Sequence, residues 1–426
     1  MLILKYPSQK KKILERFSPV IFHQSDVEKR AAEIIAAVQK RGAKAVIEFT
    51  RRFDGARLTP ATLRVPANDL KKSWDGMSAE TRAAIEFAAD RIEKFHLKQR
   101  PQSYFISEKN GIRLEYRQTA ISSAGLYVPG GTAAYPSSLL MNAIPAKIAG
   151  VERLAIITPP GKMGIVNPVI LGAAHFLGIK EVYRIGGAQG VAALALGAAG
   201  IQCVDKIVGP GNAYVAAAKR LLYGLIDIDM VAGPSEILII ADETTPLPYI
   251  VADLLSQAEH DALAVPILIY IGRLNEKAFK AELKRQIEAS PRSDFIRQAI
   301  EGQGTAVIVQ TREQAAELAN LKAPEHLEVM TEEAEKFVPL LKNAGAIFLG
   351  LFTPEPIGDY VAGPNHVLPT GGTARFFSPL SVTDFMKGTS ILQISQKGLR
   401  QLGAAAIHLA EVEGLDAHAQ AIKLRL

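Results

Sequence analysis

The sequence predicts an α/β protein with two parallel-sheet modules and a helical segment at each end. From about residue 150 onward, short β-rich runs alternate with alanine-rich helical runs. This alternation is typical of parallel strands joined by crossover helices. The chain also has 426 residues, which is too long for one ordinary hydrophobic core.

The first 110 residues or so are expected to be mostly helical and polar. The run SDVEKRAAEIIAAVQKRG has Ser25 as an N-cap and Gly42 as a C-cap. A second run of this kind begins at Ser78, and Pro101 ends it. A turn-rich crossing follows at residues 125–138, in the run GLYVPGGTAAYPSS.

Two series of strands and helices make up the rest of the chain. In the first series, LAIITPP precedes NPVILGAAHFLG, EVYRIGG precedes AQGVAALALGAAG, and KIVGPG precedes NAYVAAAKRLLYG. The second series contains the strand candidates AVPILIYIG, GTAVIVQ, HLEVM and GAIFLG. Both series predict Rossmann-like sheets with crossover helices. From about Ser378 to the end, the chain is expected to be helical.

The composition argues against a membrane protein, a secreted protein and a nucleic-acid-binding protein. Hydrophobic residues make up 48% and charged residues 22%, and no apolar run reaches the roughly 20 residues of a membrane helix. The first apolar patch is four residues long before Lys5, too short for a secretory signal, so we expect a cytoplasmic protein. The single Cys203 excludes an intrachain disulfide. The net charge of +6 is scattered, without a basic patch rich in aromatics, which disfavours nucleic-acid binding.

Two glycine-rich turns lie between predicted strands and helices, at residues 185–190 and 209–214. Glycine allows a backbone to approach a ligand closely, and a helix N-terminus favours phosphate. The amides of Gln189 and Asn212 lie where a nucleotide could be hydrogen-bonded. Neither turn has the dinucleotide fingerprint, so tight αβ connections remain the alternative interpretation.

Polar residues that can bind a metal occur in three distant segments. Gln257 and His260 are three apart and would share one face of a helix. Asp359 and His366 lie in a segment whose glycine and proline content predicts no regular element, and the C-terminal segment carries Glu413, Asp416 and His418. From the residues alone, a metal site and a set of polar surfaces both remain open.

One further pair stands out in the run KAPEHLEVM, where Glu325 and His326 follow Pro324 and precede Leu327. Two proton-carrying groups flanked by residues that favour burial cost stability unless they are compensated. A buried ion pair at a strand start and an acid–base pair are the two interpretations.

Taken together, the motifs resemble those of the histidinol dehydrogenase family. The resemblance rests on GLYVPGG, GGAQG, GPGN, DMVAGPSE, DLLSQAEH, APEHLEV, GDYVAGPNHVLPT and EGLDAHA, in that order over nearly the whole chain. It implies a zinc-dependent oxidation of L-histidinol to L-histidine through histidinaldehyde, with two NAD+, as the last step of histidine biosynthesis. It also implies an intertwined homodimer.

The resemblance implies one zinc per subunit, held by Gln257, His260, Asp359 and His418. Two imidazoles and two oxygens suit Zn2+. The substrate's imidazole and amine would be held by the metal, whose role would be orientation. In the family's dimer the C-terminal segment crosses to the partner, so His418 and Glu413 are expected to come from the second chain.

The resemblance also assigns the remaining site residues. His326 would take a proton from the alcohol and later from the hydrated aldehyde, and Glu325 would activate water. The family's substrate contacts match Ser235, Gln257, His260, His326, Asp359, His366, Glu413 and His418. The family's NAD+ contacts match Tyr127, Gln189 and Asn212.

The predicted domain organisation has four parts. Residues 1–22 form an N-terminal arm, and residues 23–127 join residues 236–378 in an α/β domain that carries most metal and catalytic residues. Residues 128–235 form the NAD+-binding domain, and residues 379–426 form a helical dimerisation segment.

Three other functions fit parts of the sequence. A thiol-dependent aldehyde dehydrogenase would need Cys203 as its nucleophile, but its place before a predicted strand suggests a packing role. A zinc hydrolase would use Glu325 to activate a metal-bound water and would ignore NAD+. A non-catalytic metal- or nucleotide-binding protein would not need Glu325 and His326 together.

Overall fold

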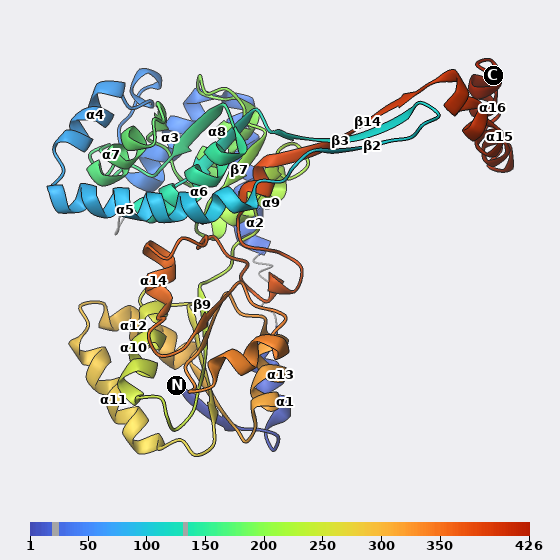
Figure 1. The fold of residues 1–426 in the computed structure, drawn as a ribbon. Coiled ribbons are helices and arrows are strands. Elements are labelled where there is room, and N and C mark those ends of the chain that lie inside the picture. Colours follow the sequence, from blue (N-terminus) through green and yellow to red (C-terminus); the bar gives the residue numbers. More distant parts are fainter. Residues whose placement is uncertain (19–24, 131–134) are drawn as a thin grey trace.

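The computed structural model describes residues 1–18, 25–130 and 135–426. These residues form two lobes, and a long arm projects from the first lobe and ends in the C-terminal helices (Figure 1). Each lobe is built on a parallel sheet, as the sequence predicts. No helix in the described residues is both long and apolar enough to cross a membrane.

The first lobe contains a five-stranded parallel sheet in the order β6-β5-β4-β7-β8. Its strands are β4 (Ser123–Tyr127), β5 (Arg153–Ile157), β6 (Glu181–Tyr183), β7 (Lys206–Val208) and β8 (Asp227–Ile228). Successive side chains enter opposite cores, because Ile156 packs in one apolar cluster and Ile157 in the other. Both faces are therefore covered, which explains the continuous apolar runs in the sequence.

Some helices of the first lobe precede its strands in the sequence, and the others connect successive strands. They are α2 (Ser25–Arg41), α3 (Ala43–Asp54), α4 (Ala67–Asp75), α5 (Ala79–His96), α6 (Pro136–Ala149), α7 (Pro168–Phe176), α8 (Gly187–Leu196) and α9 (Ala213–Leu222). Helix α5 has the predicted cap, since Ser78 accepts a hydrogen bond from the backbone of Thr81. Short 3₁₀ turns lie at Pro60–Thr62 and Leu97–Gln99.

The second lobe contains a six-stranded parallel sheet in the order β1-β11-β10-β9-β12-β13. Its strands are β1 (Leu2–Lys5), β9 (Glu236–Ala241), β10 (Val265–Ile271), β11 (Thr305–Val309), β12 (His326–Val329) and β13 (Ala346–Leu349). Strand β9 is buried throughout: Ile237 and Ile239 enter one apolar cluster, Leu238 and Ile240 the other.

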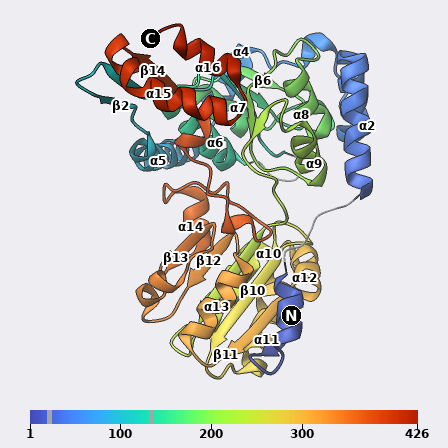
Figure 2. The same ribbon diagram turned by 90° about the vertical axis from the view of Figure 1, so that its right-hand side faces the viewer.

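The connections of the second lobe are helical as well. They include α1 (Lys10–Phe17), α10 (Leu247–Ala258), α11 (Glu276–Ala289), α12 (Ser293–Gly302), α13 (Arg312–Lys322) and α14 (Glu355–Tyr360), with 3₁₀ helices at Ala334–Leu340 and Thr373–Arg375. The 3₁₀ helix at Val382–Phe385 packs against α6 in the first lobe. Helix α14 lies on the side of this lobe that faces the first lobe (Figures 1 and 2).

Both sheets have the same strand order when β1 is set aside. Along each sheet, the third, second, first, fourth and fifth strands of the lobe follow one another. The order therefore reverses between β4 and β7 in the first lobe and between β9 and β12 in the second. In open α/β sheets, ligands bind at such reversal points, beyond the carboxyl ends of the strands.

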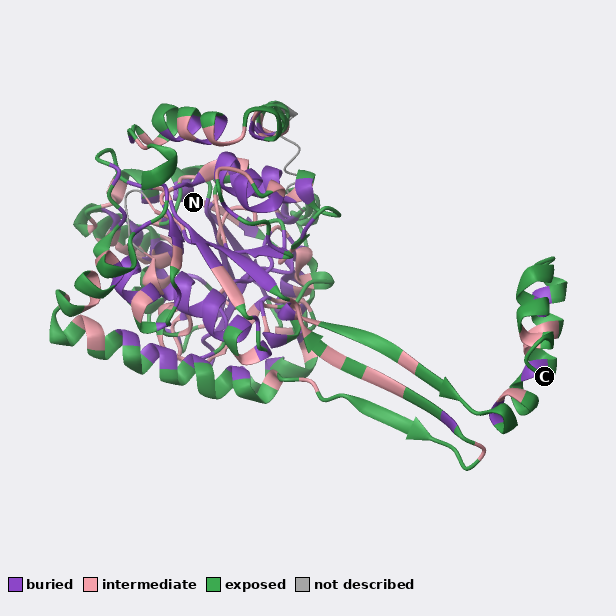
Figure 3. Ribbon diagram, turned by 90° about the horizontal axis from the view of Figure 1, so that it is seen from above, coloured by how far each residue is buried: buried purple, intermediate pink, exposed green. Residues whose placement is uncertain are grey.

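The arm is a three-stranded antiparallel sheet of β2 (Tyr104–Ser107), β3 (Ile112–Ala120) and β14 (Met386–Ile394). It carries α15 (Gln396–Val412) and α16 (Asp416–Lys423) at its end. Most of its residues are exposed, in contrast to the buried lobe interiors (Figure 3). The C-terminal segment was expected to be helical, but it begins with β14, whose nine residues pair with β3.

The structure groups two other segments differently from the predicted domains. Helices α2 to α5 pack against α6 to α9, so residues 25–100 belong to the first lobe and not with residues 236–378. Strand β1 pairs with β11, so the first residues are part of the second sheet and do not form a free arm. The predicted boundary between residues 22 and 23 lies outside the described residues.

Candidate functional site

Glu325 and His326 lie at the amino end of β12, beside β9, at the edge of the second sheet opposite the carboxyl ends of its strands. The preceding Ala323 adopts a left-handed conformation with φ of 50° and ends α13, and Pro324 then directs the chain into the strand. Glu325 is 8% exposed and His326 is 3% exposed. The pair is thus buried, as its apolar neighbours in the sequence suggest.

The backbone of Glu236 holds both members of the pair. Its N–H donates to Oε2 of Glu325 at 2.8 Å, and its carbonyl oxygen lies 3.0 Å from Nδ1 of His326. Because a carbonyl can only accept, Nδ1 of His326 carries a proton, and Nε2 is left for chemistry. The side chain of Glu236 forms a buried ion pair with Lys322 at 2.6 Å, which ties the start of β9 to the end of α13.

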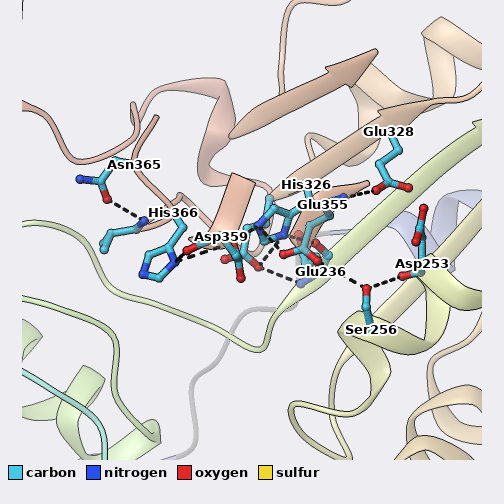
Figure 4. A network of polar contacts seen from close by, with 11 residues as sticks. Glu236, Asp253, Ser256, His326, Glu328, Glu355, Asp359, Asn365 and His366 are labelled. Atoms are coloured by element: carbon cyan, nitrogen blue, oxygen red, sulfur yellow. Dashed lines mark hydrogen bonds and ion pairs between the residues drawn. The ribbon is translucent and has the colours of Figure 1, made fainter. Parts of the chain in front are cut away.

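Nε2 of His326 faces two carboxylates of α14 (Figure 4). Glu355 Oε1 and Asp359 Oδ1 each lie 3.7 Å from it. Together the three residues form a group whose ligand atoms are close enough to hold one metal ion. Nε2 of His326 and Oε1 of Glu355 are buried and have no hydrogen-bond partner among the described residues. Unpaired buried polar atoms of this kind indicate a place for a ligand.

The charges at this edge shift several pKa values. Burial raises the pKa of Glu325 to about 7. Burial alone would lower the pKa of His326, but the charges of Glu325, Asp359 and Glu355 outweigh it and raise it to about 10. Burial would raise the pKa of Asp359, but the imidazole of His326, 3.7 Å away, and the charge of His366 hold it below its usual range. A cation beside Asp359 would weaken its hold on the His326 proton.

Three of the predicted metal ligands are in the second lobe. Gln257 is 2% exposed, and its Oε1 has no hydrogen-bond partner among the described residues. His260 was expected on the same helix face, but α10 ends at Ala258 and His260 lies in the turn that follows. Burial lowers the pKa of His260, and the charge of Asp359 opposes this effect. A neutral imidazole and an unpaired amide oxygen suit a metal ion.

Asp359 and His366 lie on the same side of the site. The sequence suggested an irregular segment here, but Asp359 lies in the last turn of α14. Proline at the first positions of a helix is favourable, so Pro354 and Pro356 start this helix and do not prevent it. His366 follows in a loop, and its Nδ1 lies 2.9 Å from the carbonyl oxygen of Asp359. Burial lowers the pKa of His366.

The remaining predicted substrate and metal residues are spread over the chain. Ser235 directly precedes β9, and its carbonyl oxygen accepts from the backbone of Val265. Glu413 and His418 are exposed on the helices at the end of the arm. Figure 1 shows that these helices are remote from β12 and α14 of the same chain. A single chain therefore does not bring the four predicted zinc ligands together.

The predicted dinucleotide residues lie at the carboxyl edge of the first sheet. Tyr127 ends β4, is 3% exposed, and accepts a hydrogen bond from Gly187 N–H at 3.2 Å. Gln189 is 1% exposed in the first turn of α8, and its Oε1 has no partner among the described residues. Asn212 caps α9 by accepting from the backbones of Tyr214 and Val215.

Several residues of the site were missed by sequence reasoning. Glu355 precedes Asp359 by four residues, a spacing that puts both on one helix face, but the segment was not expected to be a helix. Asp253 and Glu328 extend the carboxylate cluster away from His326, and burial raises the pKa of each. No sequence signal relates Glu236 to Glu325, because only the pairing of β9 and β12 brings them together.

Cys203 is not a packing residue, in contrast to the prediction. It is free and exposed, and it precedes β7 at the amino edge of the first sheet. The predicted dinucleotide residues lie at the opposite, carboxyl edge of that sheet. This placement argues against a covalent thiol mechanism.

Comparisons with known proteins point to one family. The sequence profile described as histidinol dehydrogenase matches residues 21–426. Histidinol dehydrogenase from Heliobacterium mobile is 48% identical over 402 residues, covering 94% of this chain and 94% of that protein. The Aquifex aeolicus protein of the same name is 46% identical over 422 residues, covering 99% of this chain and 96% of its own. The crystal structure of histidinol dehydrogenase from Elizabethkingia anophelis superposes with a TM-score of 0.93 at 35% identity, covering 100% of this chain and 98% of the other.

Proposed function

Because the chain belongs to the histidinol dehydrogenase family, we propose that it oxidises L-histidinol to L-histidine with two NAD+. This would be the last step of histidine biosynthesis, in the cytoplasm. The observation that carries the proposal is the buried pair of Glu325 and His326, whose orientation is set by the peptide groups of Glu236. An alcohol oxidation followed by oxidation of the hydrated aldehyde needs a base in both halves, and two adjacent groups of different basicity can share this work.

His326 acts as the base on substrate oxygen. Its Nδ1 is bound to the carbonyl oxygen of Glu236, so Nε2 is the nitrogen that would receive the proton of the alcohol and then that of the gem-diol. A cation at Asp359 would lower the His326 pKa from about 10 and so free Nε2 for this role. Glu325 takes a proton from water as it adds to the aldehyde carbon, since burial raises the pKa of this carboxyl to about 7, suited to a base near neutral pH. NAD+ supplies the hydride acceptor for each oxidation.

A zinc ion fits the residues at the edge of the second sheet. Gln257 Oε1 is buried without a partner, and His260 and Asp359 offer an imidazole and a carboxylate beside it. Gln257, His260 and Asp359 would hold the ion, with His418 from a second copy of the chain. The ion would orient the substrate through its imidazole and amine. Glu355 is an alternative ligand, because it shares a candidate metal group with Asp359 and His326.

A homodimer would complete the site. The arm exposes large apolar side chains on its strands, including Tyr104, Phe105 and Ile106, each more than half exposed. Its terminal helices expose Leu409, Val412 and Leu424. Exposed apolar surface of this extent indicates a protein interface. A second copy is the partner that would bring Glu413 and His418 to the catalytic pair, as the family resemblance implies.

The reaction is tested by counting NADH per molecule of limiting L-histidinol, first with zinc and then after metal removal. Two NADH per substrate, lost on stripping and restored by zinc, is the expected result. One NADH would mean that oxidation stops at the aldehyde, and Glu325 would then lack its role. Absence of NADH from folded, metal-loaded protein would contradict the proposal and point first to another amino alcohol as substrate. A zinc hydrolase would be the next candidate, assayed with an amide or ester of histidine.

A further inference from the structure

In addition to the buried Glu236–Lys322 ion pair of the second lobe, a buried ion pair lies in the first lobe. Nζ of Lys219, on α9, contacts Oδ1 of Asp229, which directly follows β8. The two side chains are 2% and 1% exposed. Burying two charges has a large desolvation cost, and such a pair is weak evidence for a gain in stability. Its hydrogen bonds show what else it contacts.

Both members of the pair bind the same glycine. Nζ of Lys219 donates to the carbonyl oxygen of Gly209 at 3.0 Å, and Oδ2 of Asp229 accepts from the N–H of Gly209 at 2.7 Å. The backbone donor and acceptor of this one residue are thus fixed by two side chains from different elements. Gly209 is the first residue after β7, at the reversal point of the sheet.

Gly209 has little room to take another position. Its φ of +114° is one that residues with a side chain rarely adopt, and an added Cβ would lie 2.2 Å from the carbonyl oxygen of Tyr127. The turn from residue 209 to residue 212 therefore packs directly on the end of β4. Tyr127 in turn accepts from the N–H of Gly187, which lies in the other glycine-rich turn, residues 185–190. The ion pair anchors a continuous set of contacts that includes both glycine turns.

We infer that Lys219 and Asp229 are positioning residues for the dinucleotide: by holding both polar groups of Gly209, they fix the turn that ends at Asn212 against Tyr127. The inference rests on the proposed function, because it takes the carboxyl edge of the first sheet as the NAD+ site. Asp229 also accepts from the N–H of Met230 at 2.6 Å, so the same carboxylate fixes the chain where it leaves the sheet toward Ser235.

The test is a double variant, Lys219→Met with Asp229→Asn, which removes both charges together and leaves no unpaired buried ion. Without the hydrogen bond from Lys219 to Gly209, the turn is held less firmly. The KM for NAD+ should therefore rise by about tenfold or more, with kcat changed by less than about threefold. The KM for L-histidinol and the zinc content should stay at wild-type values. Asp229→Asn alone also keeps the bond from Lys219 Nζ to the Gly209 carbonyl oxygen, so its KM for NAD+ should rise less.

A matched control is available in the same sheet. Arg153 and Glu181 form a partly buried ion pair at 2.9 Å between the amino ends of β5 and β6, at the edge opposite Gly209. Arg153→Met with Glu181→Gln should lower the melting temperature and leave the KM for NAD+ unchanged. This control separates a loss of stability from a loss of cofactor positioning.

The inference is overturned if the Lys219–Asp229 double variant behaves like the control, with a lower melting temperature and an unchanged KM for NAD+. If the double variant does not fold, the KM of Asp229→Asn decides in the same way. Binding of NADH, followed by its fluorescence, gives a readout that does not need turnover. Wild-type protein that binds NADH but does not oxidise L-histidinol would refute the proposed reaction and leave the positioning role testable by binding alone.

Discussion

Glu325 and His326 are neighbours in the chain, but their surroundings give them different basicities. Burial raises the pKa of Glu325 to about 7, whereas nearby carboxylates raise that of His326 to about 10. The backbone of Glu236 orients both side chains: its N–H donates to Glu325, and its carbonyl oxygen accepts from His326. This arrangement supports a division of work in which His326 handles substrate oxygens and Glu325 handles water.

Glu325→Gln tests that division. The amide cannot take a proton from water, so the first oxidation should persist while aldehyde hydration, and with it the second, slows by about 10²–10⁴-fold. In a single turnover, rapid-quench or stopped-flow measurement should show one fast NADH followed by a slow one. His326→Asn is the control, because it should slow both phases. Equal slowing of both phases by Glu325→Gln would contradict the separate role of Glu325.

Asp54, at the end of α3, provides a test of stability against pH. Its Oδ2 is buried without a hydrogen-bond partner among the described residues, and burial raises its pKa from 3.8 to about 6. The folded state therefore binds more protons than the unfolded state between about pH 4 and pH 6, and this group makes stability fall as pH rises through that window. Below it the penalty is absent.

Asp54→Asn should remove this penalty. The difference in melting temperature between the variant and the wild type should shift in favour of the variant as pH rises from about 4 to 7. Asp75→Asn is a comparison on an exposed helix end, where the Lys71 ammonium lowers the pKa of the carboxyl, so its shift should have the opposite sign. A pH-independent difference for Asp54→Asn would show that its carboxyl titrates alike in both states.

At the level of elements, the site is built by one strand and two helices that return to its amino end. Asp253 and Gln257 are four apart on α10, and Glu355 and Asp359 are four apart on α14. Glu355 Oε1 and Asp359 Oδ1 lie equally far from Nε2 of His326, at 3.7 Å, while Glu328 on β12 accepts from the backbone of Glu355. Both carboxylates of α14 thus belong, with His326, to one candidate metal group.

Replacing one carboxylate of α14 at a time distinguishes two possible sets of metal ligands, one with Glu355 and one without it. If Gln257, His260 and Asp359 hold zinc, Asp359→Asn should release most of the zinc, with affinity lowered by roughly 10–100-fold or more. Glu355→Gln should retain it, since Glu355 would act only as a neighbour. Zinc per chain is measured by atomic absorption after dialysis at fixed pH. Zinc loss in Glu355→Gln with retention in Asp359→Asn would favour the His326–Glu355–Asp359 group instead.

The elements also show what the sequence could and could not predict. Alternating β-rich and alanine-rich runs predicted both parallel sheets, because strands buried on both faces have continuous apolar sequences. Strand β14 was missed because its exposed residues pair only with β3, some 270 positions earlier. The position of α2 to α5 in the first lobe was not predicted, because their packing against α6 to α9 leaves no local signal in the sequence. The role of Glu236 follows only from strand pairing.

At the scale of the whole molecule, the exposed apolar surface of the arm and the site residues at its end have no counterpart within the same chain. It extends away from both lobes, exposes apolar side chains, and carries Glu413 and His418 far from β12 of its own chain (Figures 1 and 3). Three of the four residues predicted to hold zinc lie in the second lobe, and the fourth lies at the end of this arm. We therefore propose that a complete site requires two chains.

The most direct measurement is the activity of hybrids between His326→Asn and His418→Asn chains, unfolded together and refolded with zinc. Each variant alone should be inactive. In a mixed dimer one site would combine His326 of the His418→Asn chain with His418 of the His326→Asn chain, so random pairing should recover about a quarter of wild-type activity. Wild-type protein carried through the same procedure, with chain exchange followed by a size tag, shows that mixed dimers form. No recovery despite proven exchange would contradict the shared site and require His418 to act within its own chain or not at all.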